Sequence, residues 1–192
     1  EHNKLSRLER ILAALNEGEV ALVSDAGTPG ISDPGYELVR AALEAGHTVT
    51  PVPGPSAVLA ALAASGLPTD AFTFVGFLPR KATERRRFLR ALASEPRTLV
   101  AFEAPHRLLD ALADLQAEMG ERPLAVAREL TKLHEEIFRG TPTEALARFN
   151  ADPPRGEITL VIGGATVSAP ATEVWDDARV RSAVAELVAQ VA

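Results

Sequence analysis

Two short stretches of small residues are suited to bind a ligand through their main chain. One is Ser24-Asp25-Ala26-Gly27-Thr28, and the other is Pro53-Gly54-Pro55-Ser56-Ala57. Few side chains stand between their backbone N–H groups and a ligand, and the carboxylate of Asp25 suits a diol or an ammonium group. Neither stretch has the GxGxxG spacing of a dinucleotide site or the Gly-Lys-Ser/Thr ending of a phosphate loop. Ordinary connections without a ligand are the alternative interpretation.

Two clusters of charged residues follow apolar runs and offer groups that can accept or donate a proton. The first cluster comes after the run 99–102 and the second after the run 124–127. The candidate catalytic residues are Glu103 in the first cluster and Arg128, Glu129 and Lys132 in the second. Ion pairs at helix ends are the alternative for each cluster. The chain has no cysteine and its four histidines are scattered, so the sequence predicts no metal site.

A basic run interrupts a chain whose net charge is −6. Its members are Arg80, Lys81, Arg85, Arg86, Arg87 and Arg90. Cations this close together can contact several phosphates of an RNA and position it without reading its sequence. The overall negative charge argues against a protein that coats nucleic acid along its whole surface. A solvated helix face is the alternative. A cationic run in an acidic chain that comes directly after Gly76-Phe77-Leu78-Pro79 favours RNA.

Hydrophobic periodicity predicts the elements that must position these residues. The pattern predicts helices over 4–15, 34–45, 56–64, 82–93, 105–119, 143–149 and 175–191, and strands over 19–24, 47–52, 72–77, 98–102, 124–127 and 157–162. Residues 131–139 fit an extended segment or a hairpin arm. Strands alternate with helices in the first 66 residues, so we expect a parallel sheet there. Both small-residue loops would then follow the carboxyl ends of neighbouring strands, where ligands of open α/β sheets bind.

Length and composition limit the class of protein. With 192 residues and 46% hydrophobic content, the chain can bury a core as one large or two small domains. The stretch Leu67-Pro68-Thr69-Asp70 is typical of a linker and predicts a domain boundary. No apolar run approaches the roughly 20 residues of a membrane span, so we expect no membrane partner. No signal peptide is visible, and we therefore expect a cytoplasmic location.

The order of several short motifs resembles that of a known family. In sequence they are Ser24–Pro29, Ser32–Gly35, Pro53–Ala57, Ser65–Leu67, Gly76–Pro79, Phe102–Arg107, Arg128–Lys132 and Gly156–Glu157. Over residues 1–164 the chain is similar to the cytidine 2′-O-methyltransferase branch of the tetrapyrrole methylase superfamily, which modifies small-subunit ribosomal RNA. The resemblance implies two α/β/α domains with S-adenosyl-L-methionine in the cleft between them. It also implies a homodimer that acts on ribosomal RNA in the small ribosomal subunit.

The resemblance also assigns residues and domains. The implied cofactor contacts are Ser24, Asp25, Ala26, Gly27, Thr28, Ser56, Ala57 and Phe77, and ordinary core packing is the alternative for Phe77. The family's first strand and its Thr-Pro-Ile-Gly-Asn loop do not occur in this chain, so we expect them upstream of Glu1. Residues 1–68 would then be the remainder of an N-terminal cofactor-binding domain. Residues 72–164 would form a C-terminal α/β domain, and 165–192 a helical tail.

Two other functions stay open at this point. A methyltransferase that acts on a carbon of a corrin or porphyrin would use the same cofactor loops, but it would need an aromatic-lined trough. Only 5% of the residues are aromatic, and the arginine run favours RNA. A ribose hydroxyl is a poor nucleophile that needs a proton acceptor, which the charged clusters supply. The third possibility is an RNA-binding fragment without catalysis.

Overall fold

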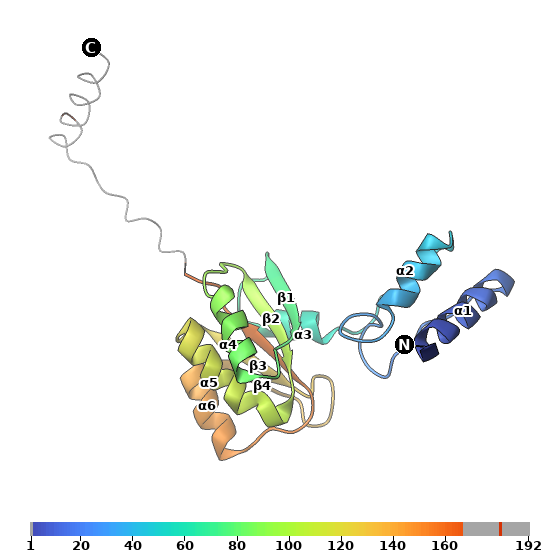
Figure 1. The fold of residues 1–192 in the computed structure, drawn as a ribbon. Coiled ribbons are helices and arrows are strands. Elements are labelled where there is room, and N and C mark those ends of the chain that lie inside the picture. The colour runs from blue at the N-terminus through green and yellow to red at the C-terminus, as the bar shows by residue number, and fades with distance from the viewer. Residues whose placement is uncertain (1, 167–180, 182–192) are drawn as a thin grey trace, which may run out of the picture.

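The computed structural model describes residues 2–166 and residue 181 (Figure 1). Nearly all of the predicted tail 165–192, with its helix over 175–191, lies outside the described residues.

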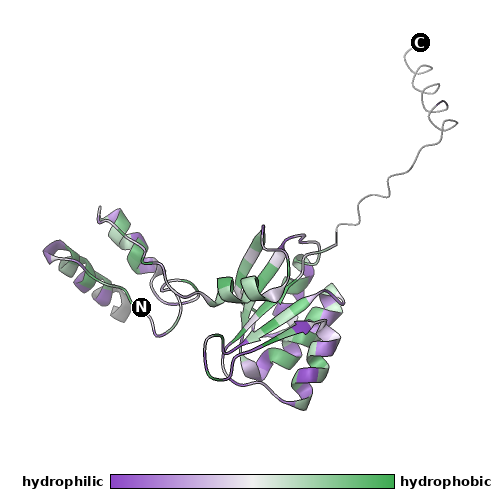
Figure 2. Ribbon diagram, turned by 180° about the vertical axis from the view of Figure 1, so that it is seen from behind, coloured by the Kyte–Doolittle hydropathy of each residue, from purple (hydrophilic) through white to green (hydrophobic). Residues whose placement is uncertain are grey.

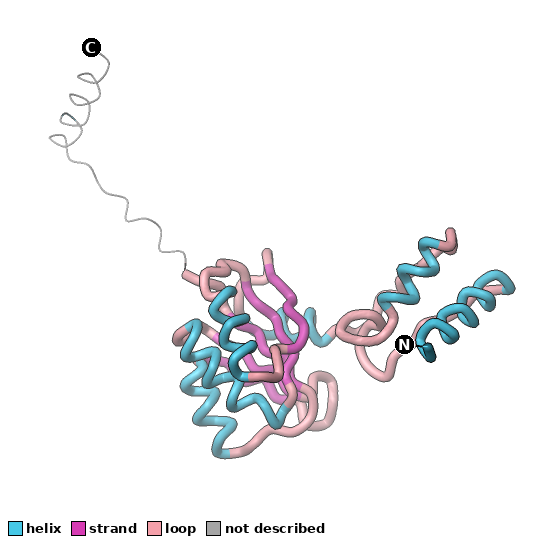
Figure 3. Tube along the Cα trace, viewed as in Figure 1, coloured by secondary structure: helices cyan, strands magenta, loops and turns pink. Residues whose placement is uncertain are grey.

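A five-stranded mixed sheet forms the centre of the described chain (Figures 1 and 3). Its strands are β1 (Phe72–Phe77), β2 (Thr98–Glu103), β3 (Leu124–Arg128), β4 (Glu136–Gly140) and β5 (Ile158–Ile162), in the spatial order β1-β2-β5-β3-β4. Strand β1 is parallel to β2, and the other neighbouring pairs are antiparallel. The sequence predicted four of these strands. Residues 131–139 were predicted only as an extended segment or a hairpin arm. This segment contains β4, which pairs with β3.

Helices cover both faces of the sheet. One face carries α4 (Ala82–Ala91), α5 (Leu108–Met119) and α6 (Pro142–Ala151), and the other carries α3 (Ala57–Ser65). A 3₁₀ turn, η1 (Pro105–Arg107), precedes α5. Successive residues of a strand point to opposite faces, so Leu99 and Ala101 of β2 join the core under α4 and α5, whereas Val100 packs against α3. Burial on both faces explains the continuous apolar runs 99–102 in β2 and 160–162 in β5.

The described helices match their predicted positions because their signals are local. The Ser56 hydroxyl accepts a hydrogen bond from the Leu59 N–H at the start of α3, and Gly66 ends this helix in the left-handed region. Thr141 and Glu144 form a capping box at the start of α6. In Figure 2 the strands are mostly hydrophobic, and hydrophilic residues gather on the flanking helices. The α/β class expected from the sequence is confirmed.

The segment before α3 departs from the prediction. Helices α1 (His2–Glu17) and α2 (Tyr36–Glu44) form as expected, but they extend away from the sheet (Figure 1). The predicted strands over 19–24 and 47–52 are wrong, because no described residue before 72 belongs to a strand. The side chains of Val23 and Val52 remain 81% and 86% exposed. A strand needs a hydrogen-bonded neighbour, and no described segment pairs with these runs, so the expected parallel sheet is absent from residues 2–66.

Candidate active site

The two small-residue loops lie side by side, although the strands expected to bring them together do not form. The Thr28 hydroxyl donates a 3.2 Å hydrogen bond to the Pro55 carbonyl. Behind the second loop, α3 is held on the sheet by Val58, Ala61 and Leu62. The loops form one wall of a cavity of about 710 Å³, a volume typical of small-molecule sites.

The cavity gathers every residue that was predicted to contact a cofactor. Its lining includes Ser24, Asp25, Ala26, Gly27, Thr28, Ser56, Ala57 and Phe77. The first loop turns back on itself through left-handed residues, with φ of +69° at Gly27 and +142° at Gly35. Gly35 follows this loop just before α2, and its φ of +142° is a conformation that residues with a side chain rarely adopt.

The opposite wall comes from the carboxyl end of β2 and the amino end of β5. Residues 102–105 and 156–159 line it, and Phe77 closes one side. The Phe77 ring is 5.4 Å from the Phe102 ring in an edge-to-face arrangement, yet Phe77 stays 55% exposed. Phe77 is therefore a cavity residue and not part of the core. The sequence pattern did not single out Glu157 or Thr159, although Glu157 belongs to one of the family motifs.

Glu103 is the one catalytic candidate of the four that lines this cavity. Its side chain is fully buried, and Oε1 accepts a 2.7 Å hydrogen bond from the Ala104 N–H and pairs with Arg107 Nη2 at 2.5 Å. Oε2 has no hydrogen-bond partner among the described residues. Burial raises the pKa of the Glu103 carboxyl, although the Ala104 N–H and the Arg107 charge act in the opposite direction. The result is a buried carboxylate with a free oxygen and an increased affinity for a proton.

The other three candidates lie beside the cavity and not on it. The Arg128 guanidinium donates to Glu136 Oε2 from Nε and Nη2, at 3.1 and 3.0 Å, and lines a separate cavity of about 340 Å³. Lys132 Nζ donates to Glu129 Oε1 and to Glu157 Oε2, both at 3.0 Å. Hydrogen bonds from the Glu157 N–H and from Lys132 lower the pKa of Glu129. The carboxylates of Glu129 and Glu157 raise the pKa of Lys132. Glu157 itself lines the larger cavity.

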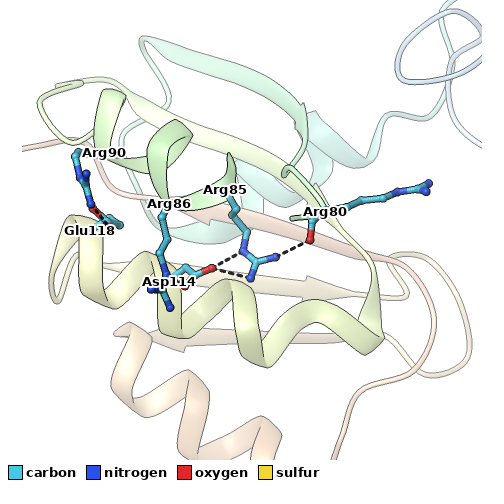
Figure 4. A network of polar contacts seen from close by, with 6 residues as sticks. All are labelled: Arg80, Arg85, Arg86, Arg90, Asp114 and Glu118. Atoms are coloured by element: carbon cyan, nitrogen blue, oxygen red, sulfur yellow. Dashed lines mark hydrogen bonds and ion pairs between the residues drawn. The ribbon is translucent and has the colours of Figure 1, made fainter. Parts of the chain in front are cut away.

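The basic run does not form one cationic surface (Figure 4). Arg85 was predicted to contact RNA, and this is wrong because its side chain is 3% exposed. Its Nε and Nη2 atoms lie 2.7 and 2.6 Å from Asp114 Oδ2 on α5. Helical periodicity puts Arg85 on the same buried face of α4 as Leu89, so the charge needs a buried carboxylate as its partner.

The rest of the run divides into paired and unpaired cations. Arg86 pairs with Asp114 Oδ1 at 2.5 Å and Arg90 with Glu118 at 2.8 Å, although both arginines are largely exposed. Lys81 pairs with Glu84 at 3.3 Å. Within the described residues, Arg80 and Arg87 have no carboxylate partner. In Figure 4 the Arg80 side chain points away from α5. These two remain the cations of the run that are free to meet a phosphate.

Comparison with known proteins now identifies the family. A model of the family described as Tetrapyrrole (Corrin/Porphyrin) Methylases matches residues 1–146. The chain belongs to the tetrapyrrole methylases. The matched part of this tetrapyrrole methylase includes both small-residue loops and all four catalytic candidates. The fold type expected from the sequence is thereby confirmed.

Individual proteins are also similar to this tetrapyrrole methylase. It is 55% identical over 168 residues to the Ribosomal RNA small subunit methyltransferase I of Synechocystis sp., which covers 86% of this chain and 60% of that protein. It is 50% identical over 165 residues to the protein of the same name from Thermotoga maritima, covering 85% of this chain and 74% of the relative. The chain thus spans about three fifths of the length of the Synechocystis relative.

A solved structure shows the same fold. It is the crystal structure of Uroporphyrin-III C-methyl transferase from Thermus thermophilus complexed with S-adenyl homocysteine. The match has a TM-score of 0.55 at 21% identity and covers 81% of this chain and 71% of that chain. No helix in the described part of this chain is long and apolar enough to cross a membrane.

Proposed function

We propose that this chain is an S-adenosyl-L-methionine-dependent methyltransferase that modifies the 2′-hydroxyl of a cytidine in small-subunit ribosomal RNA. The observation that carries the proposal is a single cavity that joins two loops of small residues to the buried carboxylate of Glu103. Relatives that are 50% and 55% identical carry the name of a ribosomal RNA methyltransferase, which supports this choice of substrate.

The residues of the cavity fit the chemistry of the cofactor. Main-chain groups of 24–28 suit the adenine edge and the methionine carboxylate, because small side chains leave them accessible. The Asp25 carboxylate suits the ribose diol or the ammonium group, and Ser56 and Ala57 complete this wall. When bound, the cofactor supplies a methyl group that the positive sulfonium has already activated. The exposed ring of Phe77 shields the reacting centre from water on the side of β1.

Glu103 is the residue to which we assign the proton of the attacking hydroxyl. A general base needs a free acceptor atom within reach of the substrate and a pKa near the working pH. Glu103 Oε2 provides an acceptor atom that is buried next to the cavity and has no hydrogen-bond partner among the described residues, and burial shifts the pKa of the carboxyl upward from its ordinary acidic value. Arg107 holds the other oxygen and so fixes the orientation of the carboxylate. Alignment of the hydroxyl with the methyl group supplies the remaining rate enhancement.

The RNA would approach along the charged rim of the cavity. Lys132 and Arg128 lie at the ends of the elements next to residues 156–158, but carboxylates of Glu129, Glu157 and Glu136 already pair with them. Arg80 follows the strand that carries Phe77 and has no acidic partner among the described residues, and Arg87 is equally free. Phosphate contacts from such side chains position an RNA and give binding a strong salt dependence. We assign Lys81, Arg86 and Arg90 a weaker share, because carboxylates already neutralise them.

Three further expectations from the family resemblance belong to this proposal. We place the protein in the cytoplasm, where it would meet the small ribosomal subunit. We also propose a homodimer, and the exposure of Tyr36 and Leu43 on α2, at 64% and 56%, supports an apolar contact surface. The division into domains 1–68 and 72–164 stays a prediction. In the described chain α3 packs on the sheet of residues 72–162.

A transfer assay tests the proposal. The chain is incubated with methyl-labelled cofactor and small ribosomal subunits that lack ribose methylation, and the labelled nucleotide is identified by mass spectrometry. We expect label on the 2′-oxygen of a cytidine. A uroporphyrinogen substrate in a parallel reaction tests the second candidate, tetrapyrrole C-methylation, which the fold neighbour and the Phe77–Phe102 pair at the cavity favour. Cofactor binding without transfer to either substrate would support the non-catalytic alternative.

A further inference from the structure

Beyond the last residue pair of the β3–β5 ladder, the Glu129 side chain joins the cavity wall at Gly156–Glu157 to the end of β3. The Glu129 carboxylate Oε1 accepts a 2.9 Å hydrogen bond from the Glu157 N–H and a 3.0 Å hydrogen bond from Lys132 Nζ. In return, the Glu129 N–H donates to the Glu157 carbonyl at 3.0 Å. Lys132 Nζ also reaches Glu157 Oε2 at 3.0 Å. Gly156 and Glu157 line the cavity, whereas Glu129 and Lys132 do not.

Gly156 is the residue that allows this attachment. Its φ is +83°, and a Cβ at this position would lie 2.2 Å from Glu129 Cδ and Oε1. The Glu129 side chain therefore occupies the space next to the Gly156 α-carbon that the Cβ of any other residue would need. Glu129 has a φ of +50°, which is uncommon for a residue with a side chain and indicates that the surrounding contacts hold it in place.

We propose that Glu129 is a positioning residue, whose carboxylate holds the Gly156–Glu157 segment and the Lys132 ammonium at the cavity wall, and that it takes no part in the chemistry itself. The pairing of Glu129 Oε1 with two donors supports this role, as does its absence from the cavity lining. The assignment of this wall to a methyl-donor cavity rests on the proposed function. The attachment itself does not depend on it.

The first experiment measures the attachment without a ligand. Hydrogen exchange at the Glu157 amide is followed by NMR in the whole chain and in two variants. Glu129→Ala removes the acceptor, so exchange should become about tenfold faster, the lower end of what a charge-assisted hydrogen bond contributes. Glu129→Gln keeps an acceptor oxygen and should leave exchange within about threefold of the original. Unchanged exchange in Glu129→Ala would overturn the proposal.

The second experiment links the attachment to the cavity. The dissociation constant of S-adenosylhomocysteine is measured by calorimetry for Glu129→Ala, Gly156→Ala and the double variant, at a temperature where all are folded. Each single variant should bind about tenfold more weakly, from the loss of one charge-assisted contact. The double variant should lose less affinity than the product of the two single losses, because the clash at Gly156 requires the Glu129 side chain and only the strain of alanine at a φ of +83° remains. Additive losses would contradict the role of Gly156.

Two comparisons keep the roles distinguishable. Gly46→Ala is the matched control, since Gly46 has a φ of +84°, lies outside the cavity lining and has no atom within 4 Å of the position that a Cβ would take. It should leave the affinity unchanged. Loss of all turnover in Glu129→Gln, with cofactor affinity intact, would make Glu129 a catalytic residue and refute the proposal. If the unaltered chain binds no S-adenosylhomocysteine, the proposed function fails, and amide exchange still decides the role of Glu129.

Discussion

Removal of the Asp114 carboxylate should destabilise the chain far more than removal of any exposed partner of the basic run. Arg85 is 3% exposed, and its contacts to Asp114 measure 2.7 and 2.6 Å, so Asp114→Ala would leave a buried guanidinium without a counter-charge. Breaking such a pair from one side costs about 3–5 kcal/mol. For a chain of this size that loss lowers the melting temperature by roughly 6–20 °C.

Urea unfolding followed by circular dichroism measures this loss directly. The matched control is Glu118→Ala on the same helix: the Glu118 side chain is 11% exposed, but its partner Arg90 is 72% exposed and is left solvated when the carboxylate is removed. A solvated cation without a partner costs little, so the control should lose much less stability than Asp114→Ala. The double variant Arg85→Met/Asp114→Leu should recover most of the stability, since it removes both buried charges. Equal and small losses in Asp114→Ala and Glu118→Ala would refute the argument that Arg85 is a structural arginine.

Three further predictions concern the cavity and its rim. Asp25→Ala should weaken S-adenosylhomocysteine binding about tenfold without a change in melting temperature, as measured by calorimetry, because Asp25 is exposed; unchanged affinity would remove it from the site. Glu103→Gln should reduce methyl transfer by about 100-fold or more. Because the pKa of Glu103 is raised in the folded chain, the protonated carboxyl favours folding at low pH, and this contribution is lost as the pH rises through that pKa. The melting temperature of Glu103→Gln, relative to that of the unaltered chain, should therefore be higher at pH 7 than at pH 4. Arg80→Gln and Arg87→Gln should each reduce the slope of RNA affinity against salt by about one, and a slope equal to that of the unaltered chain would return both residues to an ordinary solvated surface.

The helices and the ligand loops were predictable because their signals are local. The small residues of 24–28 and the cap at Ser56 act within a few positions of the chain, and all eight predicted cofactor contacts lie on one cavity. The two N-terminal strands were not predictable in the same way. An apolar run such as 19–24 shows a tendency to be buried, but only a hydrogen-bonded neighbour makes it a strand.

The roles of the charged residues were decided by tertiary structure alone. In the sequence, Arg85 and Arg87 are equivalent members of one basic run, and only the packing of α4 on α5 buries the first against Asp114. In the same way, Glu103 and Glu129 both follow apolar strands. The fold buries Glu103 beside the cavity with one oxygen unpaired, and it holds Glu129 against the main chain of Glu157 by a hydrogen bond. The sequence by itself determined which residue types are available for chemistry. The partner and the burial of each charged side chain set its proton affinity, and both depend on residues that are distant in the chain.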